Sequence, residues 1–354
     1  MYPRVLVDLK KINQNGIHIS AMCHLYGQKL AISTKLVLGN SEIAQIFEDM
    51  GVDYIADSRV KNLQKLQKIK VPKILLRIPS LYEVEKVLKY ADVSFHSSLS
   101  TLKIFQQEAE KLHLKHGIVL IIDMGDLREG IWYENFEKTN QCIEFLQESN
   151  LLEFKGIATN ITCFGGILPS KENINTFHNL VLKIEQMIGK ELEIKSFGNS
   201  SSINTLELLQ GVSNHIRIGE AIFLGRETAQ GTSIAGCVQD IFTLEAEILE
   251  IECKPSLPKG IIGRDAFGNV PSFVDQGFRK RAIVGIGKQD IGIQNLSSQI
   301  PGLEVLGASS DHMVLDIETC EVEFRVGDIL KFNLTYAGIL SLFTSNYVNK
   351  IMIK

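Results

Sequence analysis

The sequence predicts an α/β chain in which an N-terminal (β/α)8 barrel of the TIM type is followed by a C-terminal β-domain. Two observations support this prediction. Between residues 30 and 223, short apolar runs alternate with amphipathic helical patterns, as expected for parallel strands that are covered on both faces. After residue 229, apolar and charged residues alternate with a period of two, which is typical of antiparallel strands with one solvated face.

The barrel prediction depends on the number and spacing of the apolar runs. Eight such units in about 200 residues match the size of a (β/α)8 barrel, and a doubly wound open sheet is the alternative. A strand at 4–9 and a helix at 10–22 precede the series. The predicted strands are 30–35, 54–58, 74–78, 93–97, 117–124, 154–160, 194–198 and 215–223. The predicted helices are 41–50, 60–69, 81–90, 100–112, 133–148, 171–188 and 201–209, and Ser41 is the expected cap of the first.

The second domain begins with the alternating segment FTLEAEILEIEC at 242–253. Prolines and glycines punctuate the loop that follows it, and five more short strands are predicted. These strands are 280–286, 304–306, 312–317, 329–334 and 347–353. We therefore expect a barrel domain at 1–232 and a β-domain at 233–354.

Composition excludes several classes of protein. A net charge of −4 and a pI near 6.1 argue against a nucleic-acid or membrane-surface partner. None of the six cysteines stands at CxxC spacing, so neither a zinc knuckle nor a redox motif is predicted, and no metal site is expected. Scattered cysteines and an amino end without a signal-peptide pattern favour the cytoplasm.

Lys35 is the most informative single residue, because it closes the apolar run LAIST at the carboxyl end of the first barrel strand. Barrel enzymes carry their chemistry at these strand ends. Burying an ammonium is costly, and a lysine that loses its proton is a nucleophile for carbonyl groups. The alternative is a lysine that extends from the rim of the sheet into water.

Three more features follow later strands. The segment GNSSS, with Ser200 in its middle, starts a helix and could bind an anion or simply cap that helix. Arg217 lies in an apolar strand and needs a partner, either Glu220 or Asp123 in an ion pair or an acceptor in the barrel mouth. Arg128, in a glycine-bounded loop, is either solvated or part of the site. An amine, a phosphate cradle and an inward-facing arginine together are what pyridoxal phosphate requires.

The motifs resemble those of the alanine racemase-like, barrel-type pyridoxal-phosphate enzymes over nearly the whole chain. In the barrel they are VDLKKINQN, ISTKLV, IIDMGDLREG, SFGNSSSI and IRIGEAIFLGRE, and in the β-domain LGASSDHMVLDI, RVGDILKF and NLTYAGIL. Within this family, ADSRVKNL, GRETA, KPSLP, DAFGN and LGASSDH are most similar to the members that racemise ornithine. The resemblance implies interconversion of L- and D-ornithine by proton transfer at Cα.

The resemblance also implies roles for individual residues. Lys35 would form the internal aldimine with pyridoxal 5′-phosphate and act as the proton-transfer base on one face of Cα. Arg128 would contact the ring oxygen, and Arg217 would meet the pyridine nitrogen and keep it unprotonated, because a guanidinium donates and cannot accept. The residues that would help to hold the phosphate are Asn199, Ser200, Gly219 and Tyr336. The family further implies a homodimer with shared active sites.

The chain departs from the family pattern at several positions. Phe267 stands where alanine racemases have their second catalytic base, a tyrosine, so either another group serves the opposite face or one base moves between the two faces. The candidates for another group are Asp265, Cys163, Asp311 and His312. Asn160 replaces a histidine beside the ring, and Leu38-Gly39 replace a phosphate-binding tyrosine. These changes argue against alanine as the substrate. The expected substrate-binding residues are Asp265, Asp311 and His312, with Asp290 as a further acid for the δ-ammonium; each aspartate could equally cap a turn.

Other functions stay open on the sequence alone. The chain could racemise lysine, arginine or alanine, or it could be a non-catalytic pyridoxal-phosphate-binding protein, although such proteins usually lack the β-domain. A basic amino-acid decarboxylase, a metal-assisted aldolase and a cofactor-free sugar- or nucleotide-binding barrel are the remaining alternatives.

Overall fold

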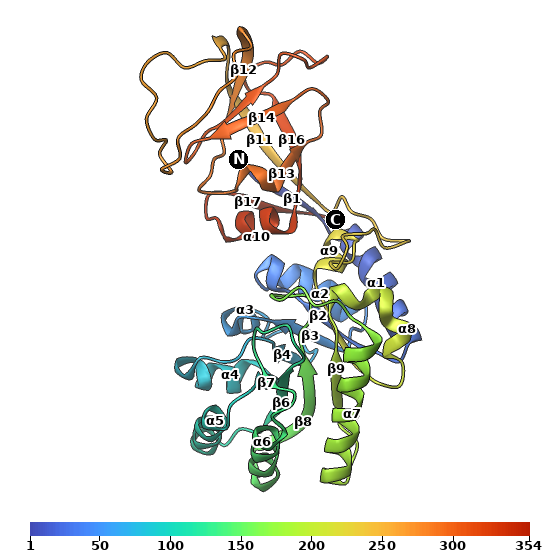
Figure 1. Ribbon diagram of the computed structural model, residues 1–354. Coiled ribbons are helices and arrows are strands. Elements are labelled where there is room, and N and C mark those ends of the chain that lie inside the picture. Colours follow the sequence, from blue (N-terminus) through green and yellow to red (C-terminus); the bar gives the residue numbers. More distant parts are fainter. The chain divides into compact units, whose positions relative to one another are not determined.

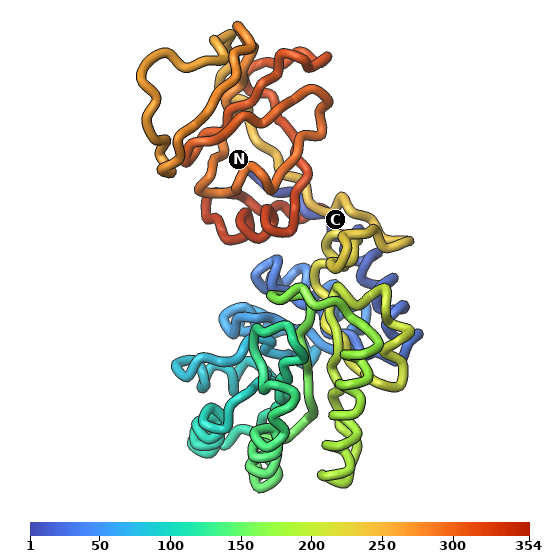
Figure 2. Tube along the Cα trace, in the orientation of Figure 1, coloured from blue at the N-terminus to red at the C-terminus, as the bar shows by residue number.

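The computed structural model describes all residues from 1 to 354 and divides the chain into two compact units. One unit is Lys11–Gln239, and the other combines Met1–Lys10 with Asp240–Lys354. Figure 1 shows the helices and strands of each unit, and Figure 2 traces the chain through them. The second unit is thus built from both ends of the chain.

The first unit is a closed barrel of eight parallel strands. β5 pairs with β6 and β10 pairs with β2, so the sheet has no free edge. This closure confirms the predicted barrel and excludes the doubly wound open sheet. A short extra strand, β7 (Ile131–Trp132), pairs with β6 outside the ring. In ring order the strands are β2 (Lys29–Ser33), β3 (Tyr54–Asp57), β4 (Lys73–Leu75), β5 (Val93–His96), β6 (His116–Asp123), β8 (Leu152–Thr159), β9 (Ile194–Phe197) and β10 (His215–Ile218).

Helices follow the strands as the periodicity predicts, with three differences. The predicted helix at 81–90 starts as a 3-10 turn, the one at 201–209 is mostly 3-10, and the predicted strand at 215–223 ends at Ile218, where a short helix begins. The α-helices are α1 (Leu9–Leu25), α2 (Ser41–Asp49), α3 (Val60–Lys65), α4 (Val84–Tyr90), α5 (Leu99–Leu112), α6 (Phe136–Glu148), α7 (Lys171–Ile188), α8 (Leu206–Leu209) and α9 (Glu220–Leu224). The 3-10 turns are η1 (Lys35–Val37), η2 (Leu81–Glu83) and η3 (Ser200–Thr205).

The barrel interior is filled by apolar side chains from alternate strand positions. On β5, Val93 and Phe95 join this interior cluster. One position requires glycine: at Gly156 of β8, φ is +149° and a Cβ would lie 1.9 Å from the carbonyl oxygen of Ile194. Strands β8 and β9 approach each other so closely there that no larger residue fits.

A polar cluster lies on the other face of β5. The hydroxyl of Ser94 is 2.8 Å from Nε2 of His96 and 2.8 Å from Nε2 of His116, and the His96 ring packs edge-on against Phe105 of α5. One hydroxyl donates one proton and accepts another, so this arrangement suits two neutral imidazoles. Burial lowers the pKa of His96 to about 3 and that of His116 to about 4, and it also lowers the pKa of His215 on β10 to about 3.

These three histidines should make the barrel sensitive to mild acid. In the unfolded chain they bind protons below about pH 6.5, whereas in the fold they stay neutral until about pH 3 to 4. The contribution of these histidines to the free energy of unfolding is therefore fully present above pH 6.5. It declines as the pH falls toward 4, by up to about 1.4 kcal/mol per pH unit for each histidine. The urea midpoint should drop clearly between pH 7 and pH 5, and His96→Gln should reduce that drop. His113→Asn, at an exposed helix end, should not, and a midpoint that stays constant over this range would contradict the expectation.

The second unit is a mostly antiparallel β-sheet with one α-helix. Its order is β13-β16-β11-β12-β15-β14, with β1 beside β11 and β17. The predicted strands are present, and β13 and the helix α10 are additions. The elements are β1 (Arg4–Asp8), β11 (Phe242–Pro255), β12 (Phe278–Val284), β13 (Leu296–Ser298), β14 (Glu304–Ala308), β15 (Met313–Asp316), β16 (Ile329–Leu334), α10 (Tyr336–Thr344) and β17 (Asn349–Ile353), together with the 3-10 turn η4 (Ile293–Asn295).

The first strand of the chain belongs to this sheet and not to the barrel. β1 pairs antiparallel with β11 and parallel with β17, and Nε of Arg4 donates to Oε2 of Glu245 at 2.7 Å. The local pattern predicts the strand correctly, but its partners lie more than two hundred residues away in the sequence.

Candidate active site

Lys35 follows the carboxyl end of β2, at the first position of the 3-10 turn η1. Its backbone is anchored through the buried Thr34, whose N–H donates to the carbonyl oxygen of Ala56 and whose hydroxyl donates to Oδ2 of Asp57, both at 2.8 Å. The lysine side chain itself is exposed, which agrees with the alternative of a lysine that extends from the rim of the sheet. Strand β2 ends two residues earlier than expected, and the side chain therefore extends beyond the covered part of the sheet.

A tight turn after Lys35 leads the chain away from the strand end. Leu38 and Gly39 both have left-handed φ values, of +52° and +62°, and a Cβ on Gly39 would lie 2.8 Å from the carbonyl oxygen of Asn62. Glycine is therefore required at this position. Asn40, and not Ser41 as predicted, caps α2 by accepting from the N–H of Ile43 at 3.1 Å.

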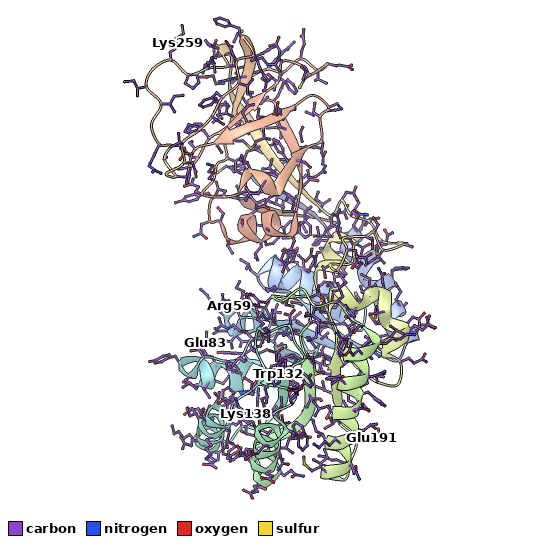
Figure 3. All side chains as sticks on the ribbon, viewed as in Figure 1. Arg59, Glu83, Trp132, Lys138, Glu191 and Lys259 are labelled. Carbon is purple, nitrogen blue, oxygen red and sulfur yellow. The ribbon has the colours of Figure 1, made fainter.

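Asp57 connects the Lys35 segment to the next strand. It is fully buried at the end of β3, and it accepts from the backbone N–H of Arg59 at 2.9 Å and from Nδ2 of Asn62 at 3.1 Å, besides the Thr34 hydroxyl. Figure 3 labels Arg59 at the start of α3. Burial raises the pKa of this carboxyl group, and the donors oppose the rise. The acid thus holds the peptide that precedes Lys35.

Removing this acid should weaken the barrel and displace the lysine. Asp57→Ala leaves three donors without an acceptor, and each loss at the two buried donors, Thr34 and Asn62, costs about 1–3 kcal/mol. We expect a large fall in the urea midpoint and a lower kcat for any reaction that uses Lys35. Thr34→Ser, which keeps the hydroxyl, should retain both, and Asp49→Ala on the exposed side of α2 is the matched control. Unchanged stability in Asp57→Ala would contradict this role.

Arg217 points away from water on β10, with 5% of its surface exposed. Its NH1 donates to the hydroxyl of Ser196 and to the carbonyl oxygen of the same residue, the latter at 3.4 Å. Its NH2 donates to the carbonyl oxygen of Thr159 at 2.6 Å and to Oδ1 of Asn160 at 2.7 Å. These neutral oxygens replace the predicted ion pair with Glu220 or Asp123, which does not form. Four of the five guanidinium protons are used, and the Nε–H is the donor left for a ligand.

The guanidinium of Arg217 stays protonated although it is buried. Burial, together with the nearby Arg128, lowers the pKa of Arg217 to about 10, and Cys163 and Glu129 oppose this shift. A pKa near 10 keeps the guanidinium protonated at neutral pH. Arg217 can therefore donate a hydrogen bond from Nε but cannot supply a proton acceptor.

Ser200 and Gly219 meet where β9 and β10 end. The Ser200 hydroxyl accepts from the backbone N–H of Gly219 and from that of Ala221, both at 3.3 Å, so its own proton remains to be donated. A Cβ on Gly219 would lie 3.2 Å from Cβ of Ser33 on β2, a tight contact that the absent side chain avoids. The remaining proton of the Ser200 hydroxyl is a donor that suits a phosphate group at this corner.

Asn199 is the helix cap that the sequence left open. Its Oδ1 accepts from the backbone N–H of Ser201 at 2.8 Å, and its Nδ2 donates to the carbonyl oxygen of Ile161 at 2.8 Å. Asn199, and not a serine, therefore caps η3 and ties it to the segment after β8.

Arg128 lies in the loop after β6 and forms a two-pronged ion pair with its neighbour Glu129. Asp123 holds this loop by accepting from the N–H groups of Gly125 at 2.9 Å and Leu127 at 3.1 Å. Asn160, after β8, donates from Nδ2 to Oε1 of Glu129 at 2.6 Å. The loop is thus connected to Arg217 through Asn160.

The strands that carry these residues are neighbours. β2, β10, β9, β8 and β6 follow one another in the ring, so Lys35, Arg217, Ser200, Asn160 and Arg128 all come from one continuous arc of strand ends. An amine, a ring-facing donor, a phosphate corner and a second arginine on one arc fit pyridoxal phosphate in the chemistry of their donors. No group of three or more His, Cys, Asp or Glu side chains is arranged to hold a metal ion.

Other predicted residues belong to the second unit, and their roles stay predictions. Tyr336 begins α10. Asp265 accepts from the N–H groups of Phe267 at 2.9 Å and Asn269 at 2.8 Å, as a turn-capping aspartate does, and these bonds lower its pKa. Asp311 lies 3.0 Å from Nδ1 of His312 in an exposed pair.

The sequence interpretation did not identify three residues that support this arc. Asp57 ends a barrel strand, and sorting all strand ends by chemistry would have found it. Glu129 follows Arg128 directly, but adjacency does not predict that two side chains pair. Ser196 lies between Lys195 and Phe197 on β9 and gave no local signal.

Comparison with known proteins agrees with this geometry. Residues 7–227 match the family model "Alanine racemase, N-terminal domain". The chain belongs to the alanine racemase family. It is 42% identical over 353 residues to an ornithine racemase of Acetoanaerobium sticklandii, with 99% of each chain covered. A lysine racemase of Thermotoga maritima is 37% identical over 357 residues, with 99% of this chain and 98% of the relative covered.

Solved alanine racemases share the fold. The structure from Clostridium difficile 630 superposes with a TM-score of 0.81 at 20% identity, covering 100% of this chain and 96% of that one. An alanine racemase from Bartonella henselae with covalently bound pyridoxal phosphate superposes with a TM-score of 0.76 at 14% identity, covering 100% of both chains. The resemblance deduced from the motifs is therefore confirmed for the family. None of the helices combines the length and hydropathy that a transmembrane span requires.

Proposed function

We propose that this alanine racemase family member is a pyridoxal 5′-phosphate-dependent enzyme that interconverts L- and D-ornithine. The 42% identity to an ornithine racemase over 99% of the chain is the observation that carries the substrate. The lysine racemase relative, at 37% identity, makes lysine the second candidate. When bound, the cofactor withdraws electrons from the substrate Cα and makes its proton removable.

The residues of the barrel would divide the work as follows. Lys35 would provide the amine that binds the cofactor aldehyde, and it would then hold and return the proton on one face of Cα. Arg217 would donate from Nε to the ring nitrogen and keep it unprotonated, which favours simple return of the proton over other outcomes. Arg128 would donate to the ring oxygen. The phosphate would be held by Ser200, Gly219, Asn199 and Tyr336.

The second face of Cα needs another acid or base. Asp265, Cys163, Asp311 and His312 remain the candidates, with Asp265, Asp311 and His312 also as candidates for binding the substrate. We further propose a homodimer with shared active sites, in which the barrel holds the cofactor and the β-domain of the partner subunit completes the site. The barrel is the unit Lys11–Gln239, and not 1–232 as the sequence suggested, because β1 belongs to the β-domain. The six free cysteines are consistent with a cytoplasmic location.

The proposal is tested by a substrate panel. The purified protein, loaded with cofactor, is incubated separately with the L-forms of ornithine, lysine, arginine and alanine, and the optical rotation is followed. Ornithine should have the highest kcat/KM. If lysine is faster, the substrate assignment fails and the racemase remains. If the cofactor binds covalently but no amino acid loses rotation, the protein is a non-catalytic cofactor carrier.

A further inference from the structure

A continuous hydrogen-bonded path connects the two arginines of the candidate site. It runs from Arg128 to the carboxylate of Glu129, from Oε1 of Glu129 to Nδ2 of Asn160 at 2.6 Å, and from Oδ1 of Asn160 to NH2 of Arg217 at 2.7 Å. Every link pairs a donor with an acceptor. Because a guanidinium only donates and a carboxylate only accepts, the orientation of the Asn160 amide is determined by its two neighbours.

Glu129 occupies one edge of the Arg128 guanidinium. Its two carboxylate oxygens accept from Nε and NH2, which leaves NH1 and the second proton of NH2 on the opposite edge. The Glu129 side chain is 19% exposed and that of Arg128 is 42% exposed, so the ion pair is only partly shielded from solvent. A fork held on one side presents its remaining donors in a fixed direction.

The same carboxylate balances the charge of the site. Two guanidinium groups reach one arc of strand ends, and Glu129 is the acid bonded into the path between them. Without it, Arg128 and Arg217 would be two cations with no hydrogen-bonded connection, because the Nδ2 of Asn160 and the guanidinium of Arg128 are both donors. Asn160 has both an acceptor and a donor atom and therefore links a carboxylate to a buried guanidinium.

We propose that Glu129 is a positioning residue that, through Asn160, sets the orientation and charge of Arg128 and Arg217 as one unit toward the bound cofactor. This inference rests on the proposed function for its catalytic consequence, whereas the hydrogen-bonded path itself does not. Its hydrogen bonds go to Arg128 and Asn160, so its role is exerted through the two arginines. A displacement of catalytic groups by about 1 Å can cost on the order of a hundredfold in rate.

The first test is Glu129→Gln in the full-length, cofactor-loaded protein. The substitution keeps the size of the side chain but removes its charge and one acceptor. We expect kcat for ornithine racemisation to fall by about tenfold to a hundredfold with little change in KM, and the visible absorption band of the bound cofactor to shift. Glu134→Gln is the matched control, because Glu134 is exposed nearby and accepts only from Trp132 and Tyr133.

The second test reverses the polarity of one link. Asn160→Asp replaces the donor to Glu129 by an oxygen, so two carboxylates face each other while the bond to Arg217 is retained. This variant should lose at least as much activity as Glu129→Gln. In the double variant Glu129→Gln with Asn160→Asp, the introduced amide can donate to the introduced carboxylate, so part of the activity lost in Asn160→Asp should return. A merely structural role predicts no such recovery.

Each outcome decides one question. If the wild-type protein racemises ornithine and the three variants match it in kcat and in absorption, the positioning role is overturned. If the double variant is worse than both single variants, the link through Asn160 is overturned. If the wild-type protein binds the cofactor but racemises nothing, the proposed function fails, and the absorption shift of Glu129→Gln against Glu134→Gln still tests the path. Urea unfolding of every variant identifies any that is not folded. If Glu129→Gln does not fold, Glu129→Asp replaces it. Because aspartate keeps the charge, the absorption band of the bound cofactor should then stay at its wild-type position.

Discussion

Replacing Lys35 by alanine should remove racemisation and covalent cofactor attachment together. The residue offers the only lysine amine on the first barrel strand end, and both the capture of the aldehyde and the proton transfer need that amine. We expect kcat to fall by at least about 10³-fold, since acid–base catalysis alone contributes about 10²- to 10⁴-fold. Borohydride reduction followed by mass spectrometry should find the cofactor on the Lys35 peptide in the wild type and nowhere in the variant.

Lys65→Ala is the matched control for this prediction. Lys65 is an exposed lysine whose Nζ donates to the carbonyl oxygen of Leu38 at 2.7 Å, so it contacts the same turn without reaching the strand end. Its loss should leave kcat and cofactor attachment near the wild-type values. Activity within tenfold of wild type in Lys35→Ala, or cofactor attached to another lysine, would show that a different amine does the chemistry.

The second large effect is expected at Arg217. Arg217→Gln withdraws a buried charge and leaves oxygens of Ser196, Thr159 and Asn160 without their donor, and such losses cost about 1–3 kcal/mol each. The ring nitrogen would also lose the Nε–H donor. We expect kcat to fall by about 10²- to 10³-fold, with a lower urea midpoint, since removing one preorganised donor from a site costs that much in other enzymes.

Arg217→Lys separates charge from geometry. Lysine keeps the positive charge but has no planar fork and no Nε–H, so it cannot satisfy the three oxygens and a ligand together. It should regain part of the stability and little of the activity. Arg226→Gln, at an exposed arginine that donates to Gln239, is the control. If Arg217→Lys has full activity, the directed donor has no role and charge alone suffices.

Local sequence patterns predict the barrel because its determinants are local. Each strand is a short apolar run before a helical pattern, and the eight runs needed no tertiary information. The errors occur where local information ends. The run AIFL after Gly219 fits either a strand or a buried helix, and the structure shows α9. β1 is a clear strand, but nothing in it indicates that Arg4 pairs with Glu245 and not with a barrel strand.

In the candidate site, the residues themselves could be predicted from local sequence, but their hydrogen-bond partners could not. The rule that chemistry lies at strand ends identifies Lys35, Arg128, Asn160, Ser200 and Arg217, and the structure places these residues on one arc. Their partners could not be predicted, because a partner is set by how strands and loops pack. An acid was one of the two partners considered for Arg217, but the guanidinium binds neutral oxygens of two neighbouring strands, β8 and β9, and of the residue after β8.

The position of the charges follows from this packing. Glu129 is the carboxylate that pairs with Arg128 directly, and it is connected to Arg217 through Asn160. A sequence alone cannot distinguish that arrangement from a direct ion pair, since both need only an acid and an arginine in nearby loops. The exposed Lys35 side chain is a similar case, because two residues of strand length decide between burial and exposure.

Deuterium exchange at Cα of ornithine is the decisive measurement. The cofactor-loaded protein is incubated with L-ornithine in D2O, and optical rotation and the Cα proton signal are followed together. Proton removal and return predicts that the rotation falls to zero while deuterium replaces the Cα proton, with no carbon dioxide or amine product. Rotation and Cα proton that both persist, while the cofactor stays covalently bound, would contradict the proposed racemase.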